Sequence, residues 1–203
     1  MPSYEINNQI LDNVDYILST VPLKNVKSDK IIKINRMLQK EDVENIENKI
    51  FHKETTELLE ITTFFNKDNF YIGKNFETKE ECINFLADEA IKKGLMNNNA
   101  KMSIFEREEM SSTSIGDLVA IPHPIYNECG TSFISILILN KPIIWDDLFV
   151  QVVFLLNVEK GKMNLWEPMF LKLYNYIKLK NGVNSILKNK SYEVFINEFE
   201  KMF

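Results

Sequence analysis

The spacing of hydrophobic residues along the chain predicts helices that alternate with short strands. The clearest helix begins at Thr78, where Thr78 and Glu81 form a capping-box pattern, and it ends at Gly94. Its apolar residues recur with the three-and-four spacing of an amphipathic helix: Ile83, Leu86, Ala87, Ala90 and Ile91. Further helices are expected over residues 98–109, 166–178, 183–187 and 192–202.

Two apolar runs in the second half of the chain predict central strands of a sheet. Residues 132–139 and 149–156 have strand length, and the second run is almost continuously apolar, as in a strand buried on both faces. Residues 52–73, by contrast, are interpreted as a connection with a helical start and an aromatic tail. This alternation predicts an α/β fold, in which helices cover both faces of a mixed sheet.

The first fifty residues predict a small, partial α/β segment ahead of that fold. Residues 16–21 and 30–34 favour two short strands, and a helix is expected to start near Lys40. Because a sheet of two strands is rarely stable alone, this segment is expected to depend on the rest of the chain or to lack a partner.

Composition and charge argue against several classes of function. Lysines and acidic residues are interleaved, the net charge is −5, and there is no basic stripe, so nucleic-acid binding by this chain is not expected. No apolar segment reaches the roughly 18 residues of a membrane span, and the start of the chain lacks a signal-peptide pattern. Cys82 and Cys129 stand in no metal-ligand pattern and fit a reducing compartment. We therefore expect a cytoplasmic protein with neither a metal nor an organic cofactor.

A histidine between two prolines is the candidate nucleophile. Pro122 and Pro124 restrict the backbone around His123, so the ring is expected to project from stiff chain at the end of an apolar strand. A neutral imidazole is a competent nucleophile near pH 7, because its ordinary pKa lies just below that value. A single histidine near an apolar strand is more often structural, however, and composition and periodicity do not decide between the two.

Groups that could hold a phosphate stand upstream of this histidine. Arg107 offers a planar, permanently charged donor fork to phosphate oxygens, and Ser112 and Thr113 could add hydroxyl donors. Phosphoryl transfer needs mainly such positioning and charge neutralisation. Taken alone, each pattern is also common on an ordinary helix surface or loop.

The order of these residues carries a resemblance to a known family. Arg-Glu-Glu, Ser-Ser-Thr, Gly and Ala-Ile-Pro-His follow one another as in the active-site signature of type-2 enzyme IIA of the bacterial sugar phosphotransferase system (PTS), the fructose and mannitol class. The resemblance implies a mixed sheet flanked by helices. It also implies that the phosphocarrier protein HPr phosphorylates His123, with Arg107, Ser112 and Thr113 completing the site.

One position departs from the pattern of that family. Transport-type members usually carry a second active-site histidine at the start of the helix after the last core strand, and here the alignment places Trp166 there. The only other histidine, His52, lies far upstream in the connection. The departure leaves His123 able to accept phosphate but puts efficient onward transfer in doubt.

The segment ahead of this domain resembles the second half of a IIB-like domain of the galactitol type, without its phosphocysteine loop. The expected organisation is a IIB-like half, a connector and a IIA-like domain: residues 1–50, 51–72 and 73–203. This order is the one found at the C-terminal end of sugar-responsive transcription regulators of the BglG antiterminator type. In such regulators nucleic acid is bound by upstream domains outside this chain.

Three hypotheses follow from these resemblances. The first is a regulatory phosphoacceptor domain of a sugar-responsive transcription regulator. The second is a transport-type enzyme IIA that passes phosphate from HPr to a IIB component of a sugar permease. The third is a binding module that keeps the fold but is not phosphorylated.

Overall fold

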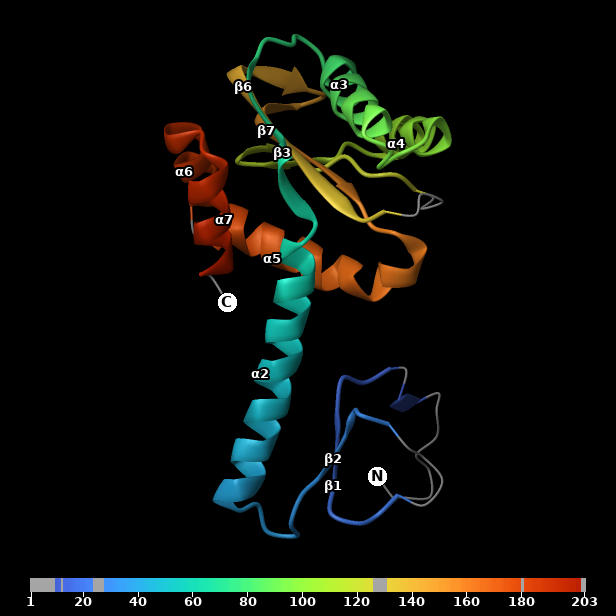
Figure 1. Ribbon diagram of the computed structural model, residues 1–203, viewed down its shortest axis with the longest axis vertical. Coiled ribbons are helices and arrows are strands. Elements are labelled where there is room, and N and C mark those ends of the chain that lie inside the picture. Colours follow the sequence, from blue (N-terminus) through green and yellow to red (C-terminus); the bar gives the residue numbers. More distant parts are fainter. Residues whose placement is uncertain (1–9, 12, 24–27, 126–130, 180, 202–203) are drawn as a thin grey trace. The chain divides into compact units, whose positions relative to one another are not determined.

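The computed structural model describes residues 10–11, 13–23, 28–125, 131–179 and 181–201 (Figure 1). The chain divides into two compact units, Met1–Thr55 and Thr56–Phe203, and each is described by itself. Helix α2 (Lys40–Thr62) contributes residues to both units.

The first unit contains the two short strands expected from the sequence. Strand β1 (Ile17–Ser19) pairs in parallel with β2 (Ile31–Lys33), and both are shorter than the apolar runs that predicted them. The buried carboxylate of Asp42 accepts the backbone N–H groups of Gln39 and Asn35, which fixes the start of α2. The bond from the Gln39 N–H is the main reason that the pKa of Asp42 is lowered.

The second unit is built on a mixed sheet of five strands in the order β3-β6-β7-β5-β4. The strands span Phe65–Lys74 (β3), Ser114–Gly116 (β4), Leu118–Ala120 (β5), Phe133–Trp145 (β6) and Leu148–Asn157 (β7). The central pair, β6 and β7, is antiparallel, while β3 runs parallel to β6 and β5 parallel to β7. Short β4 pairs antiparallel to β5 at the edge. The prediction of a mixed sheet is confirmed.

Helices cover both faces of this sheet, as the sequence predicted. One face packs against α3 (Lys79–Lys92) and α4 (Asn98–Met110). The other packs against α5 (Trp166–Leu179), α6 (Gly182–Asn189) and α7 (Tyr192–Glu200), with the 3-10 helix η1 (Lys160–Leu165) leading into α5. The alternation of β6 divides its side chains between the two layers: Ile134, Ile136 and Ile138 face α5, and Leu137 and Leu139 face α3.

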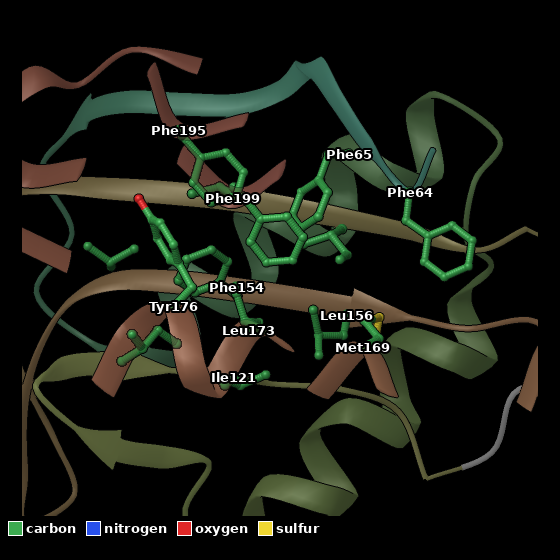
Figure 2. Packing of buried hydrophobic residues seen from close by; sticks show 14 of the residues in the cluster. Phe64, Phe65, Ile121, Phe154, Leu156, Met169, Leu173, Tyr176, Phe195 and Phe199 are labelled. Atoms are coloured by element: carbon green, nitrogen blue, oxygen red, sulfur yellow. The ribbon is translucent and has the colours of Figure 1, made fainter. Parts of the chain in front are cut away.

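An aromatic cluster fills the layer between the sheet and the C-terminal helices (Figure 2). The ring of Phe65 meets those of Phe195 and Phe199 edge to face, at centroid distances of 5.1 and 5.0 Å. Ile121 is buried in the same cluster. The backbone that leads to His123 is therefore anchored in the core.

The interpretation of residues 52–73 as a connection with a helical start and an aromatic tail is confirmed for the helical start, but the aromatic tail forms a strand. Helix α2 continues to Thr62. The ten residues from Phe65 to Lys74 then form β3, which is an edge strand of the sheet and pairs with β6. An edge strand needs only one side of its backbone paired, and β3 carries two register shifts. It consequently buries few side chains and lacks the period-two alternation that identifies a strand in a sequence.

The helix caps that the sequence predicted at Thr78 and Ser191 are confirmed. The hydroxyl of Thr78 accepts the backbone N–H of Glu81, and the Glu81 carboxylate accepts the N–H of Thr78, so the predicted capping box is present at the start of α3. At the start of α7 the hydroxyl of Ser191 accepts the backbone N–H of Val194, as a single cap bond without a reciprocal partner. Within the part of the chain that the structure describes, no helix is both long and apolar enough to cross a membrane.

Candidate functional site

His123 follows β5 in a stretch of extended chain whose backbone is fixed on both sides. The Ile121 N–H donates to the Thr113 carbonyl at 3.0 Å, and the Pro122 carbonyl accepts the N–H of Leu156 in β7 at 3.0 Å. Both flanking prolines are buried, whereas the His123 ring is half-buried. The stiffness expected from the prolines stays a prediction, and these two hydrogen bonds to the core are consistent with it.

A hydrogen bond determines which nitrogen of the ring is available for chemistry. Nδ1 of His123 lies 2.9 Å from the carbonyl oxygen of Ile121. A carbonyl oxygen only accepts, so Nδ1 carries the proton of the neutral ring and Nε2 keeps its lone pair. Burial lowers the pKa of His123, the positive charge of Arg107 lowers it further, and the Ile121 carbonyl and Glu108 oppose the shift. The neutral form of the ring therefore predominates at pH 7, with the lone pair on Nε2.

The ring of Trp166 lies beside this imidazole. Trp166 is the first residue of α5, and its ring centroid is 5.0 Å from that of His123, with the planes tilted by 58°. The position at which the resemblance expects a second histidine is thus next to His123 in space, but it carries an indole, which does not titrate near neutral pH.

Arg107 lies in the last turn of α4 and is half-buried. One guanidinium N–H donates to the Ser111 carbonyl at 2.9 Å, and its charge is close enough to lower the pKa of His123. A guanidinium has five N–H donors, so the bond to Ser111 leaves others for an anion near Nε2. The predicted pairing of Arg107 with His123 is consistent with this arrangement.

The two hydroxyls predicted to face a phosphate differ in their surroundings. Thr113 is buried, and its hydroxyl donates to Oε2 of Glu108 at 2.5 Å, so this conformation has no free Thr113 donor for a phosphate. Ser112 is half-buried, with its Oγ 2.9 Å from that of Ser114, and its hydroxyl contributes to lowering the pKa of Asp146. Of the four predicted residues, the structure brings Arg107 near His123 and links Thr113 to it through the backbone.

A buried carboxylate within the signature itself, that of Glu108, was not predicted from the sequence. Glu108 accepts three hydrogen bonds: from the Thr113 N–H, from the Thr113 hydroxyl and from Nε1 of Trp145 at the end of β6. In the sequence, Glu108 and Glu109 are indistinguishable acidic neighbours. The 3.6-residue helical period alone places them on adjacent faces without showing which face is buried.

No other group in the described residues suggests a second chemistry. Cys82 is buried in α3, and burial raises the pKa of its thiol to about 12, which keeps it protonated and unreactive. Within the described ranges, no cluster of three or more His, Cys, Asp or Glu side chains could hold a metal ion. Cys129 and the side chain of His52 lie outside the part of the chain that the structure describes.

A model of the family described as "Phosphoenolpyruvate-dependent sugar phosphotransferase system, EIIA 2" matches residues 63–202. The chain belongs to this EIIA type 2 family. The family membership that the signature around His123 implied is therefore confirmed, and the matched region of this EIIA protein begins at residue 63, just ahead of β3.

Two curated relatives of this EIIA protein are regulators from Bacillus subtilis (strain 168). The probable licABCH operon regulator is 30% identical over 198 residues, which is 98% of this chain and 30% of that protein. The transcriptional regulator ManR is 23% identical over 197 residues, or 93% of this chain and 30% of that protein. The chain thus spans about 30% of the length of each of these relatives.

The fold also matches solved structures of IIA domains. The crystal structure of IIA mannitol from Escherichia coli aligns with a TM-score of 0.56 and 16% identity, and it covers 66% of this chain and 97% of its own. At this level of identity the likeness concerns the fold alone.

Proposed function

We propose that this chain is a phosphoacceptor domain of a sugar-responsive transcription regulator, in which HPr phosphorylates His123. Family membership supports a role in the sugar phosphotransferase system. The matches to the licABCH operon regulator and to ManR extend over nearly the whole chain and so include residues ahead of the EIIA region. Because these regulators match both the EIIA region and the residues ahead of it, the regulatory hypothesis is favoured over a stand-alone transport domain.

The observation that carries the chemistry is the bond between Nδ1 of His123 and the Ile121 carbonyl. In the proposed step, the Nε2 lone pair attacks the phosphorus of phosphorylated HPr, a new N–P bond forms, and the bond from phosphorus to the phosphocarrier breaks. The proton on Nδ1 stays on the ring, held by the Ile121 carbonyl. Arg107 neutralises charge on the moving group, which is the main electrostatic demand of phosphoryl transfer.

The regulatory output would come from the charge of the phosphate. Phosphorylation adds roughly −1.5 to −2 charges and several acceptor oxygens, which change how a domain docks to its neighbours. In this proposal the phosphorylated fraction of His123 reports sugar flux to the rest of the regulator.

The organisation proposed for the chain has three parts. Residues 1–50 would be the second half of a IIB-like domain and residues 51–62 a connector, in the order of BglG-type regulators. The EIIA domain would begin near residue 63, ten residues before the expected bound of 73, because the family match starts there and β3 pairs with β6. The parallel pairing of β1 with β2, followed by α2, is compatible with such a IIB-like half. Nucleic acid would be bound by parts of the regulator outside these 203 residues.

The alternative is a transport-type enzyme IIA that passes its phosphate to a IIB domain. Trp166 disfavours it, because an indole beside His123 cannot exchange a proton as a second histidine would. The third hypothesis, a binding module that is not phosphorylated, is disfavoured by the lone pair that the Nδ1 hydrogen bond leaves on Nε2 and by the nearby Arg107.

Incubation with phosphoenolpyruvate, enzyme I and HPr tests the proposal, with intact mass as the measurement. We expect the mass of one phosphoryl group to be added to the wild-type protein and not to His123→Ala. No gain on the wild type would refute both phosphoacceptor hypotheses and leave the binding module. A gain that persists in His123→Ala would refute the residue assignment, and rapid transfer to a IIB domain would favour the transport role.

A further inference from the structure

A continuous chain of hydrogen bonds runs from Glu108 to the imidazole of His123. The Glu108 carboxylate accepts both the N–H and the hydroxyl of Thr113, at 3.1 and 2.5 Å. The Thr113 carbonyl accepts the N–H of Ile121 at 3.0 Å. The Ile121 carbonyl in turn accepts Nδ1–H of His123 at 2.9 Å. Four residues from α4, the following loop and the end of β5 are thus joined in one series.

The start of this series is buried and held from several directions. The side chain of Glu108 is only 3% exposed. Nε1 of Trp145 donates to Oε1 at 2.7 Å, and Nζ of Lys79 at the start of α3 lies 3.9 Å from the same oxygen. Lys79 also pairs with Asp146 in the turn after β6. The carboxylate therefore has little freedom to move, and the N–H and hydroxyl of Thr113 that donate to it are restrained as well.

We propose that Glu108 is a positioning residue for phosphoryl acceptance at His123, acting through Thr113 and Ile121. This inference rests on the proposed function. Its physical content is that one carboxylate with two acceptor oxygens fixes both donors of Thr113, so that the Thr113 carbonyl is aimed at Ile121. The Ile121 carbonyl is then placed to hold the proton on Nδ1 and to keep the lone pair on Nε2.

The position of Glu108 adds a second geometric effect. Glu108 directly follows Arg107 in the last turn of α4, and the loop that Glu108 fixes begins at Ser111, whose carbonyl accepts from Arg107. The Glu108 carboxylate thus fixes the position of the loop whose Ser111 carbonyl accepts a hydrogen bond from the Arg107 guanidinium. Misplacement of a phosphate-binding group by about 1 Å can lower a rate by roughly 100-fold.

The variant Glu108→Gln tests the proposal, because it keeps the size of the side chain and turns one acceptor oxygen into an N–H donor. The neighbouring Glu109→Gln removes the same charge from an exposed side chain on the same helix and serves as the matched control. We expect Glu108→Gln to slow phosphorylation by HPr at saturating HPr by about 10- to 100-fold, and Glu109→Gln to keep the wild-type rate. The assay is run well below the melting temperature of each variant.

A second pair of variants keeps the proposal testable if Glu108→Gln does not fold. Thr113→Val removes the hydroxyl donor but keeps the backbone N–H, and Thr113→Ser restores the donor. We expect Thr113→Val to slow phosphorylation and Thr113→Ser to recover most of the rate. Equal rates for valine and serine would overturn the proposal.

A readout without phosphate separates this inference from the proposed function. The ¹⁵N chemical shifts of the His123 ring report which nitrogen carries the proton, and a residue that merely stabilises the fold would not change them. We expect one tautomer, Nδ1–H, in the wild type and in Glu109→Gln, and a mixture of tautomers in Glu108→Gln. If the wild type takes no phosphate, the proposed function fails while this comparison still stands. If Glu108→Gln has the wild-type tautomer and the wild-type rate, only the positioning role fails.

Discussion

The ring centroids of His123 and Trp166 lie 5.0 Å apart, with the ring planes tilted by 58°. The resemblance to transport-type enzymes IIA places a titratable side chain at the position of Trp166. The indole beside the imidazole has a single N–H donor and no basic nitrogen. In the proposed function, this difference would favour accepting a phosphate over passing it on.

Replacement of Trp166 by histidine should make the domain a better phosphate donor. In Trp166→His, an imidazole beside His123 can donate to and accept from the departing group, and such proton transfer contributes about 100-fold or more to many reactions. We expect His123 to be phosphorylated in this variant and transfer to a IIB domain to accelerate at least about tenfold, measured by the loss of phosphate from the isolated phosphoprotein. Trp166→Phe, which keeps an aromatic ring, is the control. An equal acceleration in Trp166→Phe would show that space, and not a titratable group, limits transfer.

The pH dependence of His123 follows from its surroundings. Burial lowers its pKa below the ordinary value of 6.5, and the charge of Arg107 adds to the effect. At a pH between the folded-state pKa and 6.5, the unfolded chain binds a proton that the folded chain does not. The free energy of unfolding therefore includes a contribution that is intact above 6.5 and is lost as the pH falls through the folded-state pKa.

Proton NMR of the ring measures this pKa directly. The chain has two histidines, so the spectrum of His123→Asn identifies the signal of His123 by its disappearance. We expect the midpoint of the His123 signal below 6.5. A midpoint at or above that value would mean that the ring is solvated or faces a carboxylate, contrary to the site described above.

Gly182 offers a test of the packing behind the site. A Cβ atom at this position would overlap the ring of Tyr176, which is buried and donates to the Glu198 carboxylate at 3.1 Å. We expect Gly182→Ala to lower the free energy of unfolding by about 1–3 kcal/mol, because the ring has no space in which to retreat. Gly161→Ala is the matched control, since a Cβ there meets no atom within 4 Å. Urea unfolding compares the two, and equal losses would contradict the packing described here.

The sequence predicted the parts of the fold whose signals are local. The start of α3 was predicted because Thr78 and Glu81 form a cap within four residues. The central strands were predicted because 132–139 and 149–156 are apolar runs of strand length, the second apolar enough to be buried on both faces. Strand β3 was missed because an edge strand depends on β6 for its pairing and not on its own pattern. Strand β6 runs on to Trp145, beyond the predicted end, across a register shift that contains Pro142.

The candidate site likewise has features that the sequence could predict and features that depend on the folded chain. The order of residues from Arg107 to His123 could be recognised as a signature, and their clustering agrees with it. The burial of Glu108, by contrast, depends on Trp145 and Lys79, which lie 37 and 29 positions away and reach it only in the folded chain. Thr113 was predicted as a phosphate donor for the same reason: the sequence does not show that its hydroxyl donates to the Glu108 carboxylate.

The position of the phosphate on the ring tests the central claim most directly. The wild-type protein, labelled with ¹⁵N on histidine and phosphorylated through HPr, is examined by NMR for coupling between phosphorus and each ring nitrogen. We predict a single phosphoryl group on Nε2 of His123, with the proton still on Nδ1. Phosphate on Nδ1, or on any residue other than His123, would contradict the geometry in which the Ile121 carbonyl holds the Nδ1 proton.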